Sequence, residues 1–297
     1  MIRLENYSKK YGQFQAVYPT DLHIKEGEVY ALLGPNGGGK TTIFKSLAGL
    51  SRPNTGKVLI AGENLWEKPE AVKAKLSFLP QRVTIPENLS ITEVLNFFAS
   101  LKGVPHHRID EILDHIDVKG RMRQKVGELS GGMLQRLGLV ITFLGDTPVY
   151  ILDEPTLNLD LDGMKRFRKY IRLLKDKGKT IIVSSHTLVD AESLADRVGV
   201  IAGGRLVLDQ SVVDFRDRVK NQTSMVLVLA NKIPSLVEAA LGAGAVSADF
   251  ENGYFRYRAD QIRQIKVLEA IRESGGDIIS IATEKPSLDQ LIEEHYE

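Results

Sequence analysis

The sequence predicts an α/β protein with a parallel sheet covered on both faces by helices, followed by a small α+β domain. A short apolar run at 29–33 (VYALL) is followed by a glycine-rich loop and by helical spacing over Thr41–Leu50. From residue 149 onward apolar runs alternate with helical patterns, which is typical of a parallel sheet. Beyond residue 223 the first six of seven short segments follow in the order βαββαβ, which predicts a ferredoxin-like module.

Composition narrows the class of protein. The chain has 297 residues, enough for two domains at about 150 residues each. Hydrophobic residues make up 43% and charged residues 26%, which is usual for a globular protein. The net charge of +1 argues against nonspecific nucleic-acid binding, which needs a basic excess. The absence of cysteine excludes disulfides, cysteine-ligated zinc, iron–sulfur clusters and a cysteine nucleophile.

No stretch of the sequence has the pattern of a signal peptide or a membrane span. The N-terminal segment MIRLENYSKKYGQFQ lacks an apolar core. The longest apolar stretch, Leu137–Leu144, contains Gly138 and Thr142 and is far shorter than the roughly 20 residues of a spanning helix. We therefore expect a cytosolic protein unless a partner holds it at a membrane.

The N-terminal part of the α/β body is predicted to contain strands and then a helical insertion. Ile2 and Leu4 lie on one side of a first strand, and Val17–Ile24 forms a second. Over residues 82–146 the apolar side chains instead recur at helical spacing. Examples are Val94, Leu95, Phe97, Phe98 and Leu101. This stretch is predicted as a helical subdomain inserted in the α/β body.

The second half of the body resumes the strand and helix alternation. Strands are predicted at 149–153, 180–186 and 197–209, and helices at 161–177 and 187–196. Because each strand is followed by a helix, the strands are expected to lie parallel in one sheet.

The C-terminal part forms a separate prediction. Its expected strands are Ser224–Leu229, Ala245–Phe250, Tyr254–Tyr257 and Ile278–Thr283. Its expected helices are Ile233–Leu241, Gln261–Glu273 and Ser287–His295. We place the first domain at 1–215, a polar linker at 216–223 and the C-terminal domain at 224–297. Residues 219–297 carry eight basic and twelve acidic side chains, so this domain is a poor candidate for binding nucleic acid.

Residues 34–41 (GPNGGGKT) match the phosphate-loop pattern G-x-x-x-x-G-K-[ST]. Glycines allow backbone N–H groups to converge on phosphates, and the following helix N-terminus adds a favourable dipole. Lys40 is expected to reach the β- and γ-phosphates, and the Thr41 hydroxyl to ligate Mg²⁺. The candidate nucleotide-binding residues here are Gly34, Asn36, Gly37, Gly39, Lys40, Thr41 and Thr42.

Two carboxylates end the apolar run at 149–152. Asp153 is expected to hold Mg²⁺ through water, and Glu154 to polarise the water that attacks the γ-phosphate. Strand ends of an open parallel sheet lie in the crevice where ligands bind. The alternative, two solvated acids at the start of a loop, loses weight because a phosphate loop lies upstream.

Further segments resemble those of the ABC-type ATPases. Residues 129–136 (LSGGMLQR) resemble the family's signature motif, and Ser130 lies 23 residues before Asp153, as in that family. The other matching landmarks, in chain order, are Tyr11 (adenine stacking), Gln81 (Q-loop), Leu159-Asp160 (D-loop) and His186 (switch histidine). The resemblance covers residues 1–215 and implies a P-loop NTPase of ABC type with a helical subdomain.

The resemblance also implies roles for these residues. Gln81 would contact Mg²⁺ and the attacking water, so the implied catalytic residues are Glu154, His186 and Gln81, and the implied metal ligands are Thr41, Gln81 and Asp153. In the family, Ser130, Gly131 and Gly132 contact ATP held by another subunit, which implies a head-to-tail homodimer around two MgATP. Asp160 would reach across that dimer.

Three residues depart from the family pattern. Met133 stands where glutamine is more usual, Gly38 where alanine or serine is more usual, and Asn158 where glycine is more usual. None removes a catalytic group, so we expect an active ATPase.

The resemblance implies the ATP-binding subunit of a transporter, peripheral on the cytoplasmic face of the inner membrane and coupled to a separate integral permease. Residues 81–83 and 87–98 would dock that permease, although their apolar members could equally be core. The alternatives are a soluble ABC ATPase acting on ribosomes or DNA, and a regulatory binding domain. A single phosphate loop and the lack of a long coiled coil disfavour the first, and Glu154 disfavours the second.

The cargo and the role of the C-terminal domain stay open at this point. The pattern resembles the drug- and lipid-exporter branch of the family, and through residues 78–95 also the copper-processing ATPase of nitrous-oxide reductase maturation. The C-terminal domain could add a dimer contact, bind a regulatory ligand or brace the permease, and a homodimer brace is favoured.

Overall fold

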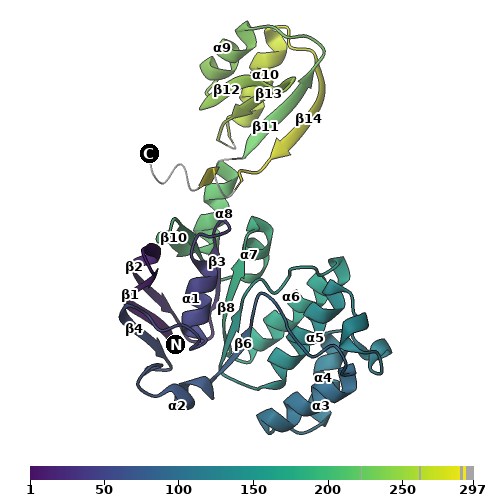
Figure 1. Cartoon of the computed structure of the whole chain (residues 1–297). Helices are drawn as coiled ribbons and strands as arrows, with labels where there is room; N and C mark the ends of the chain where they lie inside the picture. The colour runs from purple at the N-terminus through teal and green to yellow at the C-terminus, as the bar shows by residue number, and fades with distance from the viewer. Residues whose placement is uncertain (222, 261, 288–289, 292–297) are drawn as a thin grey trace. The chain divides into compact units, whose positions relative to one another are not determined.

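The computed structural model describes residues 1–221, 223–260, 262–287 and 290–291. The chain divides into two compact units, Met1–Val212 and Val213–Glu297 (Figure 1). The boundary lies three residues before the expected end of the first domain at residue 215.

A six-stranded sheet forms the centre of the first unit. Its order is β10-β9-β3-β8-β7-β6, in which the last five strands are parallel and β10 is antiparallel. The strands are β3 (Val29–Leu33), β6 (Leu76–Leu79), β7 (Val149–Leu152), β8 (Thr180–Ser185), β9 (Arg197–Ala202) and β10 (Arg205–Ser211). Every residue of β3, β7 and β8 is buried, which explains their continuous apolar runs.

An antiparallel sheet of order β2-β1-β4-β5 packs beside it. It consists of β1 (Ile2–Tyr11), β2 (Phe14–Ile24), β4 (Thr55–Ile60) and β5 (Glu63–Asn64). Apolar side chains of both sheets and of helix α1 (Lys40–Leu47) form one core, which includes Leu4, Leu32 and Phe44.

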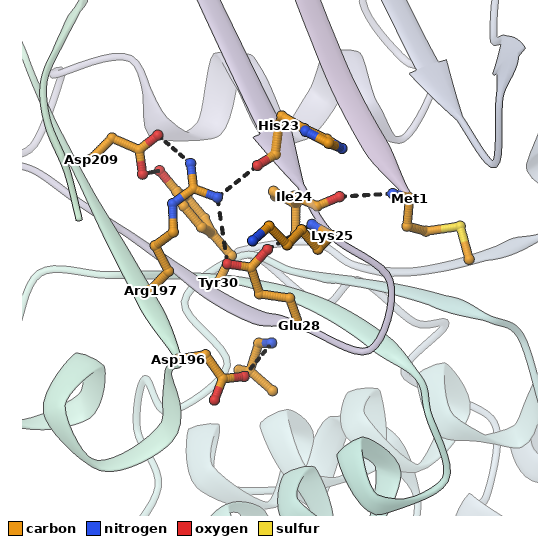
Figure 2. Close-up of polar contacts among 10 residues, drawn as sticks. Met1, His23, Ile24, Lys25, Glu28, Tyr30, Asp196, Arg197 and Asp209 are labelled. Carbon is orange, nitrogen blue, oxygen red and sulfur yellow. Dashed lines mark hydrogen bonds and ion pairs between the residues drawn. The ribbon is translucent and has the colours of Figure 1, made fainter. Parts of the chain in front are cut away.

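The guanidinium of Arg197 joins the two sheets through polar contacts (Figure 2). Arg197, on β9, donates to the backbone carbonyl of His23 on β2 at 2.7 Å. It also pairs with Asp209 on β10 and lies 3.4 Å from the Glu28 carboxylate. The Tyr30 hydroxyl donates to the other oxygen of Asp209 at 3.3 Å, so this network joins both sheets.

The helices between β6 and β7 agree with the helical subdomain expected at 82–146. They are α3 (Ile91–Lys102), α4 (His107–His115), two short 3₁₀ turns at Lys119–Arg121 and Val126–Glu128, and α5 (Gly131–Leu144). They gather on the side of the unit away from β1, β2 and β4 (Figure 1). Ser90 and Glu93 form a reciprocal capping box that fixes the start of α3.

Three further helices complete the first unit. They are α2 (Pro69–Lys73), α6 (Leu161–Asp176) and α7 (Leu188–Leu194). In α6 the buried residues Phe167, Tyr170, Ile171 and Leu174 follow the spacing of one helix face, which explains why this polar segment is helical.

The second unit has the expected βαββαβ order. It contains β11 (Ser224–Leu229), α9 (Ser235–Gly242), β12 (Ser247–Glu251), β13 (Tyr254–Arg258), α10 (Gln264–Glu273) and β14 (Ile278–Glu284). The sheet order β12-β13-β11-β14, with every pair antiparallel, is that of a ferredoxin-like module. Apolar residues of its sheet and helices form a core of their own.

Two segments of this region, 216–223 and 287–295, were predicted as a linker and a helix. Most of the stretch predicted as a linker, 216–223, is helical and belongs to α8 (Val212–Asn221). Phe215 and Val219, four residues apart, are both buried, so the polar residues between them occupy the exposed side of a helix turn. The helix expected at Ser287–His295 falls mainly on residues outside the described part of the chain.

Candidate functional site

Four of the segments singled out from the sequence meet at one edge of the parallel sheet. The glycine-rich loop follows β3, Asp153 follows β7, His186 follows β8 and Gln81 lies two residues beyond β6. These strands are neighbours in the order β3-β8-β7-β6 and run in the same direction. Their carboxyl ends therefore bring these segments together, at the edge where open parallel sheets bind ligands.

The glycine-rich loop has a backbone that only glycine accommodates at two points. Gly39, the residue before α1, has φ of +114°, a region that side chains strongly disfavour. A Cβ on Gly34 would lie 2.2 Å from the carbonyl oxygen of Ile201 on β9. The loop is thus held close to the sheet and leads directly into the N-terminus of α1.

Lys40 folds back over this loop. Its side chain is buried, with 5% of the residue exposed, and its Nζ donates to the carbonyl oxygens of Gly34 at 2.7 Å and Pro35 at 3.0 Å. Burial lowers the pKa of Lys40, while the carboxylates of Glu154 and Asp153 act in the opposite direction. The ammonium therefore lies against the glycine-rich loop, where it can pair with an anionic ligand.

Asp153 and Glu154 are both buried and share Ser184. The Ser184 hydroxyl donates to Oδ1 of Asp153 at 2.5 Å and accepts the Glu154 backbone N–H at 2.8 Å. Glu154 adopts a positive φ of 50°, which is uncommon for a residue with a side chain. Such backbone strain is found where the surrounding structure fixes a functional side chain.

The second oxygen of Asp153 is an unusual feature. Oδ2 is buried and has no hydrogen-bond partner within the described part of the chain. Burial raises the pKa of Asp153, while the Ser184 and Thr41 hydroxyls oppose this rise. A buried acceptor without a donor costs free energy, and such positions are characteristic of sites that hold a cation or an ordered water.

The signature segment lies at a different place. Ser130 precedes α5 and its hydroxyl accepts the Met133 N–H at 3.3 Å. A Cβ on Gly132 would lie 2.6 Å from the carbonyl oxygen of Asn158, so glycine is required where α5 approaches the D-loop. Beside these residues is a cavity of about 560 Å³. Its lining residues are Asp117, Val118, Gly120, Arg121, Ser130, Gly132, Met133, Arg136, Asn158 and Asp160.

Asp160 has partners within its own chain. Its Oδ1 accepts the Gly163 N–H at 2.8 Å, which caps α6, and it pairs with Arg136 at 2.5 Å. These two interactions, that with Gly163 first, lower the pKa of Asp160. The carboxylate therefore joins the D-loop to the signature helix, while its role across a dimer stays a prediction.

The remaining candidates lie nearer the surface. Tyr11 is half exposed, and its hydroxyl lies 3.3 Å from that of Ser51. His186 is exposed and Gln81 is partly buried. Gly131 is the first residue of α5, and Thr42 lies in the first turn of α1.

Sequence reasoning missed several residues that organise this site. Ser184 is one, and the polar pair that ends the apolar run TIIVSS was a visible signal for it. Gln135 is another, because its buried amide donates to the carbonyls of Glu154 at 3.3 Å and Pro155 at 3.1 Å. Thr156 and Asp190 had no sequence signal at all.

The fold and this edge define an ATP-binding α/β protein of the phosphate-loop type. A family model described as ABC transporter matches residues 17–157. The bacitracin transport ATP-binding protein of Bacillus licheniformis is 31% identical over 97% of this chain and 95% of its own length. A daunorubicin resistance ATP-binding protein of Streptomyces coeruleorubidus is 30% identical over 98% of this chain and 94% of its own.

Solved structures agree with this fold. The structure of an ATP-binding subunit of an ABC transporter has a TM-score of 0.68 and 27% identity, and the match covers 73% of this chain and 92% of that one. A dimeric ATP-binding cassette bound to ADP and phosphate has a TM-score of 0.66 at 24% identity, over 71% and 99% of the two chains.

The chain belongs to the ABC transporter family, as an ATP-binding subunit. It is accordingly an ATPase whose hydrolysis is coupled to transport. Within the described residues, none of the helices has the length and apolar character needed to cross a bilayer.

Proposed function

We propose that two copies of this chain associate head-to-tail around two MgATP and drive a separate membrane permease from the cytoplasmic face of the inner membrane. The first unit is the ATPase domain and the second is an accessory domain. Each nucleotide lies between the glycine-rich loop of one copy and the signature segment of the other.

The main support for the head-to-tail dimer is the separate location of two groups of residues. The glycine-rich loop, Asp153, Glu154 and His186 share the carboxyl edge of the sheet, whereas Ser130 and Gly132 border a cavity whose lining contains none of those residues. Because the start of α5 borders a different cavity from the loop residues, we infer that the α5 N–H groups which contact a phosphate on the loop belong to a second chain. The solved cassette that is dimeric with ADP and phosphate has the same fold, which supports this arrangement.

The reaction is the attack of water on the γ-phosphate, in which positioning and charge stabilisation supply most of the catalysis. Glu154, held rigid at the end of β7, accepts the proton of the water. Lys40 leaves the carbonyls of Gly34 and Pro35 and pairs with the β- and γ-phosphates. His186, at the end of the neighbouring strand β8, donates to a γ-phosphate oxygen.

The residues at the sheet edge fit a magnesium ion. Asp153 Oδ2 is a buried carboxylate oxygen with no donor among the described residues, and the Thr41 hydroxyl is close enough to influence the pKa of that group. Oxygen donors of this kind are those that Mg²⁺ prefers. Thr41, Asp153 and Gln81 would hold the ion, which supplies positive charge to the phosphate oxygens when bound.

Ser130→Arg should prevent the closed dimer. The added side chain would project from the start of α5 into the space that the partner's triphosphate must occupy, while a single chain should still bind ATP. Size-exclusion chromatography of an ATP-loaded, hydrolysis-deficient background measures the dimer. Ser100→Arg, on the exposed side of α3, is the matched control and should dimerise normally. A normal ATP-dependent dimer in the Ser130 variant would contradict the head-to-tail arrangement.

A surface on α3 supports docking to a permease. Phe97 is 60% exposed and Leu101 is 68% exposed on this helix, so both add apolar area to the surface of the helical subdomain. Val83, near Gln81, is partly buried. A permease that contacts both this helix face and the Q-loop segment could sense the state of the nucleotide.

Phe97→Glu should abolish co-purification with the membrane protein while the ATPase activity of the isolated chain stays unchanged, because most of this side chain lies outside the core. The measurement is recovery of the tagged protein with solubilised membranes, next to its basal ATP hydrolysis. Undiminished recovery of the variant with the membrane protein would exclude this face as the docking surface.

The relatives support a proposal for the class of cargo. The bacitracin and daunorubicin proteins match nearly the whole of this chain, the second unit included. This supports an exporter of drug or lipid type, in which the permease selects the molecule that is carried.

A further inference from the structure

Asp190 is a buried carboxylate that has no part in the reaction described above. It lies in the first turn of α7, and 7% of the residue is exposed. Its Oδ2 accepts the Thr156 hydroxyl at 2.8 Å and, more weakly, the Ser185 hydroxyl at 3.4 Å. Its Oδ1 accepts Nη2 of Arg168, on α6, at 2.9 Å. Burying a charged carboxylate costs free energy of desolvation, and these hydrogen bonds and the ion pair offset that cost.

The partners of Asp190 come from the two segments that carry the reaction. Thr156 lies two residues after Glu154 in the loop beyond β7, and Ser185 is the last residue of β8, directly before His186. Ser185 is itself fixed, since its hydroxyl accepts the Thr187 N–H at 3.0 Å. The Asp190 carboxylate therefore connects the loop after Glu154 to the end of β8, which leads into His186.

A second hydrogen bond, from the backbone N–H of Glu154, also holds this loop. Ser184 accepts the Glu154 N–H, and it belongs to the same strand end as Ser185. Glu154, with φ of +50°, is thus bonded at its N–H to Ser184, and the loop two residues further on is bonded to Asp190 through Thr156. Because a displacement of a reacting group by about 1 Å can cost 100-fold in rate, such bracing affects catalysis directly.

We propose that Asp190 is a positioning residue for ATP hydrolysis, acting through its bond to Thr156 to hold the Glu154 loop in register with the His186 segment. Arg168 supplies the charge that lets the carboxylate remain buried. The proposal rests on the function proposed above. It predicts that the hydroxyl of Thr156 is needed for turnover because it donates to Asp190.

Thr156→Val tests this, because valine keeps the shape of threonine and removes only the hydroxyl. We expect kcat to fall about 10- to 100-fold, with KM for ATP changed by less than about twofold. Thr156→Ser restores the hydroxyl and should recover most of the rate. If the Thr156 hydroxyl only stabilised the fold, the Val and Ser variants would differ in thermal midpoint. A difference in kcat at equal ATP binding and equal thermal midpoint therefore indicates a positioning role.

Asp190→Asn is the second variant, since it keeps the size and one acceptor oxygen but weakens the pairing with Arg168 and Thr156. Combined with Thr156→Val it should add little further loss, because both changes weaken the same hydrogen bond between Thr156 and Asp190. Asp146→Asn is the matched control: it removes the ion pair between the exposed Asp146 carboxylate and Lys179, which lie before the amino ends of β7 and β8, and should leave kcat unchanged.

The outcomes separate this inference from the function it rests on. Wild-type kcat in Thr156→Val, with hydrolysis lost in Glu154→Gln, would overturn the role of Asp190 alone. Full activity of Glu154→Gln would overturn the proposed chemistry itself. Additive losses in the Thr156 and Asp190 double variant would also overturn the proposal, because the two residues would then act separately.

Discussion

Glu154→Gln should lower ATP hydrolysis by roughly 100- to 10,000-fold, the usual contribution of a general base. Glutamine keeps the size of the side chain but cannot accept a proton from water. The backbone that holds it is unaffected, because the hydrogen bonds of residue 154 to Ser184 and Gln135 come from its own N–H and carbonyl. Phosphate release under saturating ATP and Mg²⁺ gives the rate.

The same variant should still bind ATP and accumulate as the closed dimer, since only the step that opens it is lost. Equilibrium binding of a fluorescent ATP analogue and the elution volume with ATP check both points. Glu70→Gln, an exposed residue in the first turn of α2, is the matched control and should hydrolyse ATP normally. Brisk turnover by Glu154→Gln would remove this carboxylate from the role of base.

Lys40→Ala should weaken ATP binding by about 10- to 150-fold, which corresponds to the roughly 1.5–3 kcal/mol of a hydrogen bond to a charged group. The ammonium is buried beside the loop and donates its hydrogen bonds to the backbone carbonyls of Gly34 and Pro35, so a triphosphate can replace these acceptors with stronger, charge-assisted bonds. Isothermal titration with ATP and Mg²⁺ measures the loss, and hydrolysis should fall with it.

Lys45→Ala is the matched control for Lys40→Ala, because Lys45 lies on the exposed side of the same helix. It should bind ATP as the unmodified chain does. If the Lys40 variant retained its affinity for ATP and remained folded, the glycine-rich loop would bind the phosphates without this side chain.

Local features of the site were predictable from the sequence. The glycine-rich loop lies between a buried strand and a helix, and Lys40 reaches carbonyls only five and six residues away. The ferredoxin-like order of the second unit followed from six short segments. The helix over 212–221 was not predicted, because its composition is polar and only Phe215 and Val219 form its buried face.

The sequence by itself determined the chemistry that is available, since the residue types and their spacing are written in contiguous motifs such as 34–41 and 149–154. Only the tertiary structure decided which groups meet. The hydrogen bonds from Ser184 to Asp153 and from Thr156 to Asp190 join residues 31 and 34 positions apart. They exist because β7 and β8 are adjacent and parallel, and strand adjacency is set by packing over the whole sheet rather than by any local pattern.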